Sequence, residues 1–343
     1  ISFILRSLVH TMAELSVTIA SANVEPKVRF AVVSWAPVGS TMAVVGNDAK
    51  IGSWDPSKGL VMKCSLGSQR FESEPDYWSV ETEMTLEELG KVEFKFVRKD
   101  PNESTWQWDD GENRKVKTTE CSGLSTILLP VVRFRDGSGA ESDLTGRFYS
   151  TVKERREMSV RVVSDNIILG SCPRRPEHLD LLKSLGVTVV MNFQAETDAM
   201  KNCVEGIGME ENALAISPLY DKVGIKYVWM PTEDMSSAAR AAMLPQAAYV
   251  MAGVLRQGHK IYVHCNAGVG RSVAAVCGYL YYCVGMAPRQ VEHVVARSRT
   301  VAYFDFPALD VAKARYEGLF GGPSPSLNEE KVRLLTAAGL PVE

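Results

Sequence analysis

The sequence predicts an α+β chain of two domains, an all-β sandwich followed by an α/β domain. Two domains are expected because the chain has 343 residues, 45% of them hydrophobic, which is enough for two separate cores. Between Val28 and Phe134, short apolar runs with alternating polar residues are separated by clusters of Gly, Asn, Asp, Pro and Ser, a pattern typical of a sandwich or barrel. After Ser159, apolar strands alternate with helical stretches, which is typical of an α/β domain.

The breaks in these patterns predict the domain boundaries. We expect an N-terminal extension over 1–25, the β domain over 26–134, a polar linker over 135–157, the α/β domain over 158–322 and a flexible C-terminal tail over 323–343. The linker is rich in Gly and Ser and has room for one short amphipathic piece. Three helices are predicted after Gly270, and the sequence GGPSP from Gly321 ends the last of them.

Composition excludes several classes of partner. The net charge is −3 with no run of five or more like charges, so we expect no nucleic-acid and no membrane partner, and no segment is apolar enough to span a bilayer. The seven cysteines are scattered and odd in number, which favours a reducing compartment such as the cytoplasm over a disulfide framework. The five histidines have no ligand spacing, so we predict no metal and no cofactor.

Three cysteines are followed six positions later by an arginine. That spacing lets one loop carry an attacking thiolate and a guanidinium that holds phosphoryl oxygens. Cys64 with Arg70 lies in the β-rich region without a following helix, and Cys283 with Arg289 straddles a helix end, so we expect both to be chance pairs and Cys283 to be a core thiol. Only the pair in HCNAGVGRS follows an apolar strand, KIYVH, and precedes a long helix.

The segment from Cys265 to Arg271, called the phosphate loop below, is predicted to bind a phosphate. Its glycines free the backbone to curl, so that the amide groups and the N-terminus of the next helix can converge on one anion. The same field lowers the pKa of the Cys265 thiol, and Ser272 can donate a hydrogen bond to the sulfur. The expected phosphate-binding residues are Asn266, Ala267, Gly268, Val269, Gly270 and Arg271.

A general acid is expected upstream of the loop. Asp234 in WMPTEDMS follows a predicted strand and precedes Cys265 by 31 positions, so it can give a proton to the leaving oxygen and later activate water. Glu233 is the alternative donor, and a solvated loop acid is the other explanation for both. His264 is expected to orient the loop rather than to carry a proton.

These residues resemble those of the dual-specificity phosphatases over about 158–322. More narrowly, HCNAGVGRS, NFQ at 192–194, GSCPR at 170–174, MPTEDMS and MLPQA look like the glucan phosphatases of the laforin family. The resemblance implies Cys265 as nucleophile, Arg271 as phosphate clamp and Asp234 as acid. It also implies glucan contacts for Met235 and Tyr303, although packing at the rim or in the core would explain these two equally well.

The resemblance has a limit and a further implication. Residues 196–218 depart from that family, so no glucan contact is carried over for them. Laforin-like proteins can form a homodimer through the end of the phosphatase domain, which makes Phe320 a candidate contact. Within the loop, Asn266, Ala267 and Val269 add no cation to Arg271, which suits a single phosphate on a neutral polymer.

The first domain resembles a starch-binding module of the kind fused to amylases. VGNDAKIGSWDP, VEFKFV and WDDGENR carry this resemblance, which implies Trp54 and Trp108 as platforms for sugar rings. It also implies that Lys95 and Asn113 hydrogen-bond to sugar hydroxyl groups. Trp106 is a rival for Trp108, and Trp78 is expected in the core. Strand alternation in VEFKFV points Val92, Phe94 and Phe96 inward and Lys95 outward.

Together these features predict a phosphatase that binds glycogen or a starch-like glucan and hydrolyses its phosphate monoesters through a phosphocysteine. It would lie in the cytoplasm on glycogen or starch-like granules. The alternatives are a glycogen-bound scaffold that recruits partner proteins, and a protein phosphatase that is merely targeted by its sugar-binding domain.

Overall fold

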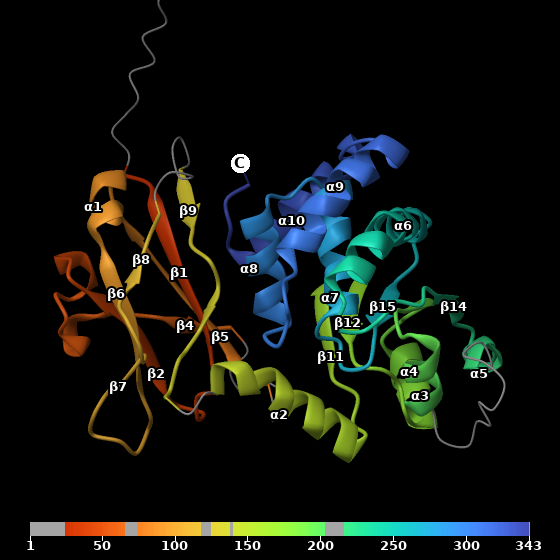
Figure 1. Cartoon of the computed structure of the whole chain (residues 1–343), viewed down its shortest axis with the longest axis horizontal. Coiled ribbons are helices and arrows are strands. Elements are labelled where there is room, and N and C mark those ends of the chain that lie inside the picture. The colour runs from red at the N-terminus through yellow and green to blue at the C-terminus, as the bar shows by residue number, and fades with distance from the viewer. Residues whose placement is uncertain (1–24, 66–73, 118–124, 138–139, 203–215, 343) are drawn as a thin grey trace, which may run out of the picture.

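The computed structural model describes residues 25–65, 74–117, 125–137, 140–202 and 216–342. It confirms the predicted fold class, with a β-sandwich followed by an α/β domain (Figure 1). Apart from Glu25, the predicted N-terminal extension lies outside the described residues.

Two sheets of five described strands each form the sandwich. Sheet A has the order β10-β1-β5-β4, with β9 also paired to β1, and sheet B has the order β3-β2-β6-β7, with β8 also paired to β6. The strands of sheet A are β1 (Lys27–Ser34), β4 (Lys63–Cys64), β5 (Asp76–Glu83), β9 (Thr126–Leu128) and β10 (Val132–Arg133). Those of sheet B are β2 (Thr41–Gly46), β3 (Leu60–Val61), β6 (Glu93–Lys99), β7 (Gln107–Trp108) and β8 (Arg114–Lys115).

Alternation along the strands fills the sandwich core as predicted. Val92, Phe94 and Phe96 are buried there, and Phe30 of sheet A meets Phe94 edge to face with ring centroids 5.0 Å apart. Trp78 is also a core residue, as expected. A short helix, α1 (Leu86–Lys91), begins with a capping box between Thr85 and Glu88 and leads into β6.

The second domain is built on sheet C, with the order β11-β12-β15-β13-β14. Strand β11 is antiparallel to β12, and the other neighbours are parallel. Their bounds are β11 (Val160–Ser164), β12 (Ile167–Gly170), β13 (Val189–Asn192), β14 (Lys226–Trp229) and β15 (Ile261–His264). Because β15 lies between β12 and β13, His264 at its carboxyl end is opposite Gly170 on one side and Asn192 on the other.

Helices cover both faces of sheet C. On one face, Ile261 and Val263 of β15 belong to a core with α6 (Ser237–Arg256), α7 (Arg271–Gly278), the π-helical turn Tyr279–Cys283, α8 (Pro288–Ser298) and α9 (Phe306–Phe320). On the other face, Tyr262 packs with residues of α3 (Pro176–Ser184), α4 (Glu196–Lys201) and α5 (Ser217–Lys222). The strand therefore reads as a continuous apolar run because both of its faces are buried.

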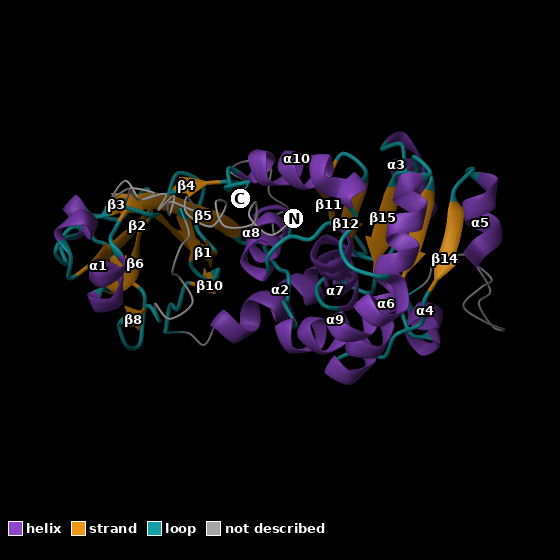
Figure 2. Ribbon diagram, turned by 90° about the horizontal axis from the view of Figure 1, so that it is seen from above, coloured by secondary structure: helices purple, strands orange, loops and turns teal. Residues whose placement is uncertain are grey.

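The sandwich packs against the α/β domain through sheet A. Figures 1 and 2 both show α8 between sheet A and strands β11 and β12, while sheet B lies on the far side of the sandwich. Tyr77 Oη lies 2.7 Å from His293 Nδ1, and His293 Nε2 lies 2.8 Å from the carbonyl of Leu129. Ala31, Val33 and Tyr77 form one apolar cluster with Ala296 of α8. The outer face of sheet A is thus an interface between the domains.

The linker and the tail differ from their predictions. Residues 140–155 form a helix, α2 (Ala140–Arg155), whose Phe148 and Val152 are buried in a cluster with Ala267 and Val301. The tail contains α10 (Asn328–Ala338), with Leu334 and Leu335 buried in the core of the α/β domain. Outside these buried positions, the residues of α2 and α10 whose burial is described are mostly exposed or half-buried, which explains why both segments are polar in sequence.

Among the described residues, no helix is long and apolar enough to cross a membrane.

Candidate functional site

The phosphate loop connects the end of β15 to the first residue of α7. Gly268 adopts a φ of +70°, and a Cβ there would come within 2.2 Å of the carbonyl oxygen of Gly170 on β12. Only glycine fits this position, because the conformation is left-handed and the space beside it is filled. The loop is therefore curled tightly over the end of β12.

Every carbonyl group from Cys265 to Gly270 accepts a hydrogen bond. The donors are His264 Nδ1 to Cys265 at 3.1 Å, Cys172 N to Asn266 at 3.0 Å, Arg299 Nη2 to Ala267 at 2.5 Å, Arg299 Nε to Gly268 at 2.9 Å, Tyr303 N to Val269 at 2.9 Å and Ala274 N to Gly270 at 2.8 Å. Since a trans peptide places N–H opposite C=O, carbonyls that are held outward turn the amides inward. Within the described part of the chain, the amides of Asn266, Ala267, Val269 and Gly270 make no hydrogen bond. They form a nest of free donors for an anion.

Cys265 lies at the base of this nest, with 4% of its surface exposed. Burial of the thiol opposes ionisation, but the Arg271 guanidinium, the Ser272 hydroxyl and the amides of Ser272 and Gly268 outweigh it and lower the pKa of Cys265. Its Sγ lies 3.3 Å from Ser272 Oγ. By contrast, burial raises the pKa of Cys172 and of Cys283 to about 11. Among these three buried thiols, the surroundings favour a thiolate only at Cys265.

Arg271 is almost fully buried and is held from one side. Its Nη1 donates to Asp198 Oδ2 at 2.7 Å and to the carbonyl of Thr232 at 3.0 Å. Its Nη2 lies 2.9 Å from Asp234 Oδ2, yet Nε and Nη2 have no hydrogen-bond partner among the described residues. Nε is thus left for a phosphoryl oxygen, and Nη2, which faces only the Asp234 carboxylate, can supply the second donor of the fork that arginine offers to phosphate.

Asp198 was not predicted from the sequence. It lies in the first turn of α4, inside the region that departs from the related family, and its contact with Arg271 joins residues 73 positions apart. The nearby sequence contains only an ordinary acidic helix start, so no local signal marked it.

Asp234 is placed beside the phosphate loop, and its carboxylate is 44% exposed. Its Oδ1 accepts a hydrogen bond from Met235 N at 3.0 Å, which fixes the carboxylate toward Arg271. Glu233, the alternative acid, is exposed, and Met235 is 91% exposed with a φ of 56°. Of the two acids, Asp234 is the one whose carboxylate is beside Arg271 of the phosphate loop.

Polar residues behind the loop hold it in place. Gln194 Nε2 donates to Asn266 Oδ1 at 2.7 Å, and Gln194 N donates to Asn192 Oδ1 at 2.8 Å. Burial lowers the pKa of His264 to about 4, so its ring is neutral and its Nδ1–H can donate to the Cys265 carbonyl. The orienting position expected for His264 agrees with this contact, whereas the sequence identified NFQ only as a family mark.

Tyr303 is beside the phosphate loop, because its amide donates to the carbonyl of Val269, and its side chain is half exposed. Its ring is stacked on Arg240, whose guanidinium carbon is 5.4 Å from the ring centroid, and Arg240 forms an ion pair with Asp305 at 2.6 Å. The aromatic face is therefore held rigidly at the entrance.

The predicted sugar-binding tryptophans lie on sheet B, away from the phosphatase domain. Trp54 and Trp106 pack on the apolar patch formed by Ala43, Val45 and Val97. Trp108 is 37% exposed and is directly opposite Val97 in the β6–β7 pair. Trp106, treated as a rival of Trp108, thus shares the patch with Trp54.

The polar residue Lys95 of this face hydrogen-bonds to the turn that follows Trp108. Lys95 Nζ donates to the carbonyls of Asp109 at 3.0 Å and Gly111 at 2.7 Å, and Asn113 Nδ2 donates to Glu93 at 3.0 Å. Asp109, which sequence reasoning missed, is fully buried and forms ion pairs with Arg114 and Arg135. Lys95 and Asp109 together fix the backbone that presents Trp108.

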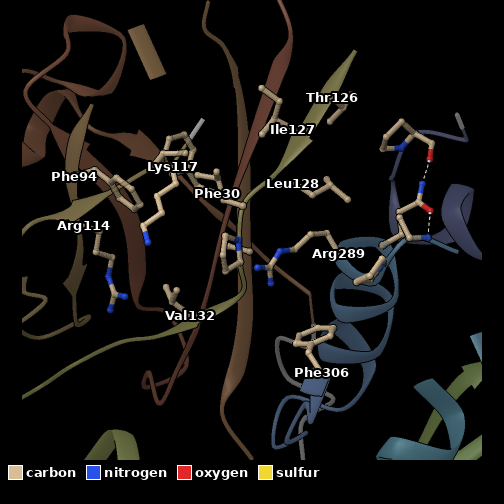
Figure 3. Close-up of a pocket in the computed structure, with 18 of the residues that line it drawn as sticks. Phe30, Phe94, Arg114, Lys117, Thr126, Ile127, Leu128, Val132, Arg289 and Phe306 are labelled. Atoms are coloured by element: carbon tan, nitrogen blue, oxygen red, sulfur yellow. Dashed lines mark hydrogen bonds between the residues drawn. The ribbon is translucent and has the colours of Figure 1, made fainter. Parts of the chain in front are cut away.

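The other Cys–Arg pairs have different surroundings. Cys283 is a buried core thiol whose Sγ lies 3.0 Å from Tyr316 Oη, as expected, and Arg289 pairs with Glu292. Arg70 lies outside the described residues. A cavity of about 900 Å³ opens where the sandwich meets α8 and α9 (Figure 3), but no predicted site residue lines it.

Comparisons with known proteins match the sandwich and the α/β domain to two different families. A starch binding domain model matches residues 25–127, and a model of the dual specificity phosphatase catalytic domain matches residues 167–303. Laforin of Mus musculus is 34% identical over 305 residues, covering 82% of this chain and 92% of laforin. The phosphoglucan phosphatase DSP4, amyloplastic, of Castanea sativa is 24% identical over 185 residues, covering 53% of this chain and 46% of its own length. A cyclomaltodextrin glucanotransferase of Paenibacillus macerans is 30% identical over 91 residues, covering 26% of this chain and 12% of its own length.

The fold, the loop and the two domain matches define a cysteine-dependent phosphatase of the dual-specificity class that carries a starch-binding domain. The similarity to laforin extends through both domains and nearly the whole of the relative. The chain belongs to the laforin family.

The hydrogen bond from Ser272 predicts how Cys265 ionises. In Ser272→Ala the thiolate loses a donor, so the pKa of Cys265 rises and alkylation by iodoacetate near pH 6 slows roughly tenfold, because a hydrogen bond to a charged group contributes about 1.5 kcal/mol. The two rates should converge as the pH rises above both pKa values. The pH dependence of alkylation at Cys265, followed by mass spectrometry, measures this.

Ser184→Ala, which removes an exposed hydroxyl bonded to Leu181, is the matched control and should leave the profile unchanged. An unchanged profile in Ser272→Ala would contradict the assignment.

Proposed function

We propose that this chain binds a glucan through its sandwich and hydrolyses phosphate monoesters of that glucan at Cys265. The observation that carries the proposal is the nest of free amides around a thiol of lowered pKa, completed by Arg271, whose Nε has no hydrogen-bond partner among the described residues and whose Nη2 forms an ion pair with Asp234. The starch-binding domain and the similarity to a phosphoglucan phosphatase support a glucan as the substrate.

The reaction has two steps. The Cys265 thiolate attacks phosphorus, Asp234 gives its proton to the leaving sugar oxygen, and the P–O bond breaks to leave a phosphocysteine. Asp234, now ionised, then removes a proton from water, which attacks phosphorus and releases phosphate and the thiolate. Arg271 and the amides of the loop bind the equatorial oxygens throughout, and the Ser272 hydroxyl stabilises the departing sulfur.

The two binding surfaces divide the work. Trp54, Trp108, Lys95 and Asn113 would hold the polymer on sheet B, while Tyr303 and Met235 guide a chain at the rim of the phosphate loop. Because sheet B lies on the side of the sandwich that faces away from the catalytic domain, the first surface acts as a tether that raises the local concentration of phosphorylated chains.

We place the protein in the cytoplasm, associated with glycogen or starch-like granules. The chemistry requires a reduced thiol, and the described cysteines Cys172, Cys265, Cys277 and Cys283 form no disulfide. The proposed units are the sandwich over 26–134 and the phosphatase over 158–322, with α2 and α10 packed on the latter.

Cys265→Ser should abolish phosphate release from phosphorylated amylopectin, and Asp234→Asn should reduce it roughly 100-fold, within the range for loss of a general acid. Both variants should still co-sediment with amylopectin. Asp234→Asn should lose less activity on an aryl phosphate, whose leaving group needs no proton. Malachite-green detection of phosphate measures both reactions.

Equal turnover of amylopectin by wild type and Cys265→Ser would contradict the assigned nucleophile. Release from a phosphotyrosyl peptide but not from amylopectin would instead favour a targeted protein phosphatase.

Trp54→Ala and Lys95→Ala should weaken retention on amylopectin at least tenfold, because one removes an apolar platform and the other releases the turn that presents Trp108. Hydrolysis of a small aryl phosphate should remain within twofold of wild type. Co-sedimentation and aryl phosphate kinetics provide the two readouts. Lys63→Ala, an exposed lysine on sheet A, is the matched control and should retain glucan binding. A parallel loss of both activities in Trp54→Ala would contradict a separate tether.

We also propose that two copies can associate through the end of α9. Phe320 and Tyr249 are stacked 4.2 Å apart and partly exposed, beside the exposed Leu319. Phe320→Ser should then lower the dimer fraction in sedimentation velocity, while Val38→Ser at an exposed site of the sandwich should not. A wild-type protein that is monomeric at every concentration tested would exclude this interface.

A further inference from the structure

Arg299 connects the phosphate loop to the other domain. It follows α8, is fully buried, and uses Nη2 and Nε to hold the carbonyls of Ala267 and Gly268. Its Nη1 points the other way, to Glu74 Oε1 at 2.8 Å and Ser159 Oγ at 2.6 Å. Two of the six carbonyls that shape the loop therefore depend on one side chain.

Glu74 comes from the sandwich, two residues before β5, and lies within the part of the chain that matches the starch binding domain. Its carboxylate is fully buried. Oε1 accepts from Arg299 and from Ser159 Oγ at 2.8 Å, and Oε2 accepts from Arg161 Nε at 2.6 Å. One carboxylate thus compensates guanidinium groups on two elements of the catalytic domain.

The charge of Arg299 is costly without this partner. Burial disfavours its charged form, and Glu74 is the leading opposing influence on the pKa of Arg299. An ion removed from water needs a close counter-charge and hydrogen bonds to all its donors. The ring of Phe148 from α2 lies 4.8 Å from the guanidinium carbon and closes the remaining side. Without Glu74, the buried charge of Arg299 has no counter-charge, and this favours a reorientation of Arg299 toward water that releases the carbonyls of the loop.

The phosphate loop is packed too tightly to keep its shape if Arg299 moves. A Cβ on Gly268 would approach Arg299 Nη2 to 2.9 Å as well as the Gly170 carbonyl, so this part of the loop lies in close contact with both. If the carbonyls of Ala267 and Gly268 rotate, the amide of Gly268 must turn away from Cys265 and the amide of Val269 must leave the nest, since each amide shares a peptide plane with the preceding carbonyl.

We propose that Glu74 is a positioning residue for the phosphate loop, so that the starch-binding domain completes the phosphatase site through Arg299. The inference rests on the proposed role of the loop in phosphate binding. It concerns the phosphate rather than the glucan, and therefore applies equally to a small aryl phosphate.

The test uses full-length variants, p-nitrophenyl phosphate as substrate and orthovanadate as the probe of the loop. Glu74→Gln keeps the shape but removes the charge, and should lower kcat/KM roughly 10- to 100-fold, the effect of a slightly misplaced site. The vanadate inhibition constant should rise by at least tenfold, while retention on amylopectin stays at the wild-type level. Glu81→Gln is the matched control. It breaks an ion pair with Arg29, which donates to Ala338 at the same domain interface but not to the loop, and should leave both constants within twofold.

A double-mutant cycle separates positioning from a general structural role. If Glu74 acts through Arg299, adding Glu74→Gln to Arg299→Gln should change vanadate affinity by less than twofold. A further loss as large as that in the wild-type background would overturn the proposal, and so would wild-type vanadate affinity in Glu74→Gln. Should Glu74→Gln fail to fold, Arg299→Lys provides the second test. It keeps the charge beside Glu74 but cannot hold two carbonyls, so tenfold weaker vanadate binding supports the proposal and unchanged binding contradicts it. Failure of wild type to dephosphorylate amylopectin would refute the glucan substrate while leaving this result intact.

Discussion

The structure depends on one constraint: the carbonyl groups of the phosphate loop are all held away from its centre. A backbone segment that binds an anion must turn its amides inward, and it keeps them there only if each carbonyl has another partner. Here the partners are His264, the residue Cys172 just after β12, α7 and the segment after α8, which includes Nε and Nη2 of Arg299. The lowered pKa of Cys265 follows from the same convergence of donors, Arg271 among them, on one buried point.

The arrangement of the two domains explains how a tether and a catalytic loop coexist. Strand β1 is buried on both faces, because Phe30 and Val32 fill the sandwich while Ala31 and Val33 pack toward α8. The outer face of sheet A is therefore covered by the catalytic domain, and the outer face of sheet B is the one available to a polymer. The same interface places Glu74 within reach of Arg299, so the contact that orients the domains also reaches the phosphate loop.

Local signals were sufficient for the loop and for the sandwich core. Cys265, the glycines and the following helix are contiguous, and the alternation of Val92, Phe94 and Phe96 follows from strand geometry alone. The resemblance to the laforin family, made on short motifs, is confirmed by a relative that matches both domains. Helix α2 was expected only as a short amphipathic piece, and α10 was not predicted. The few apolar residues of each helix pack on residues that are distant in sequence, such as Ala267 for α2. Asp198, Asp109 and Glu74 were missed for a related reason, since each is an ordinary acid in sequence and acquires its role from a distant arginine.

A crystal structure of the Cys265→Ser variant with phosphate or tungstate would show whether the loop binds an anion through its amides. We expect an anion in the loop, with its oxygens within hydrogen-bonding distance of the amides of residues 266–270 and of Arg271 Nε and Nη2. The carbonyls of Ala267 and Gly268 should still be held by Arg299. An empty loop at saturating anion, or an anion bound with these carbonyls turned toward it, would contradict the account.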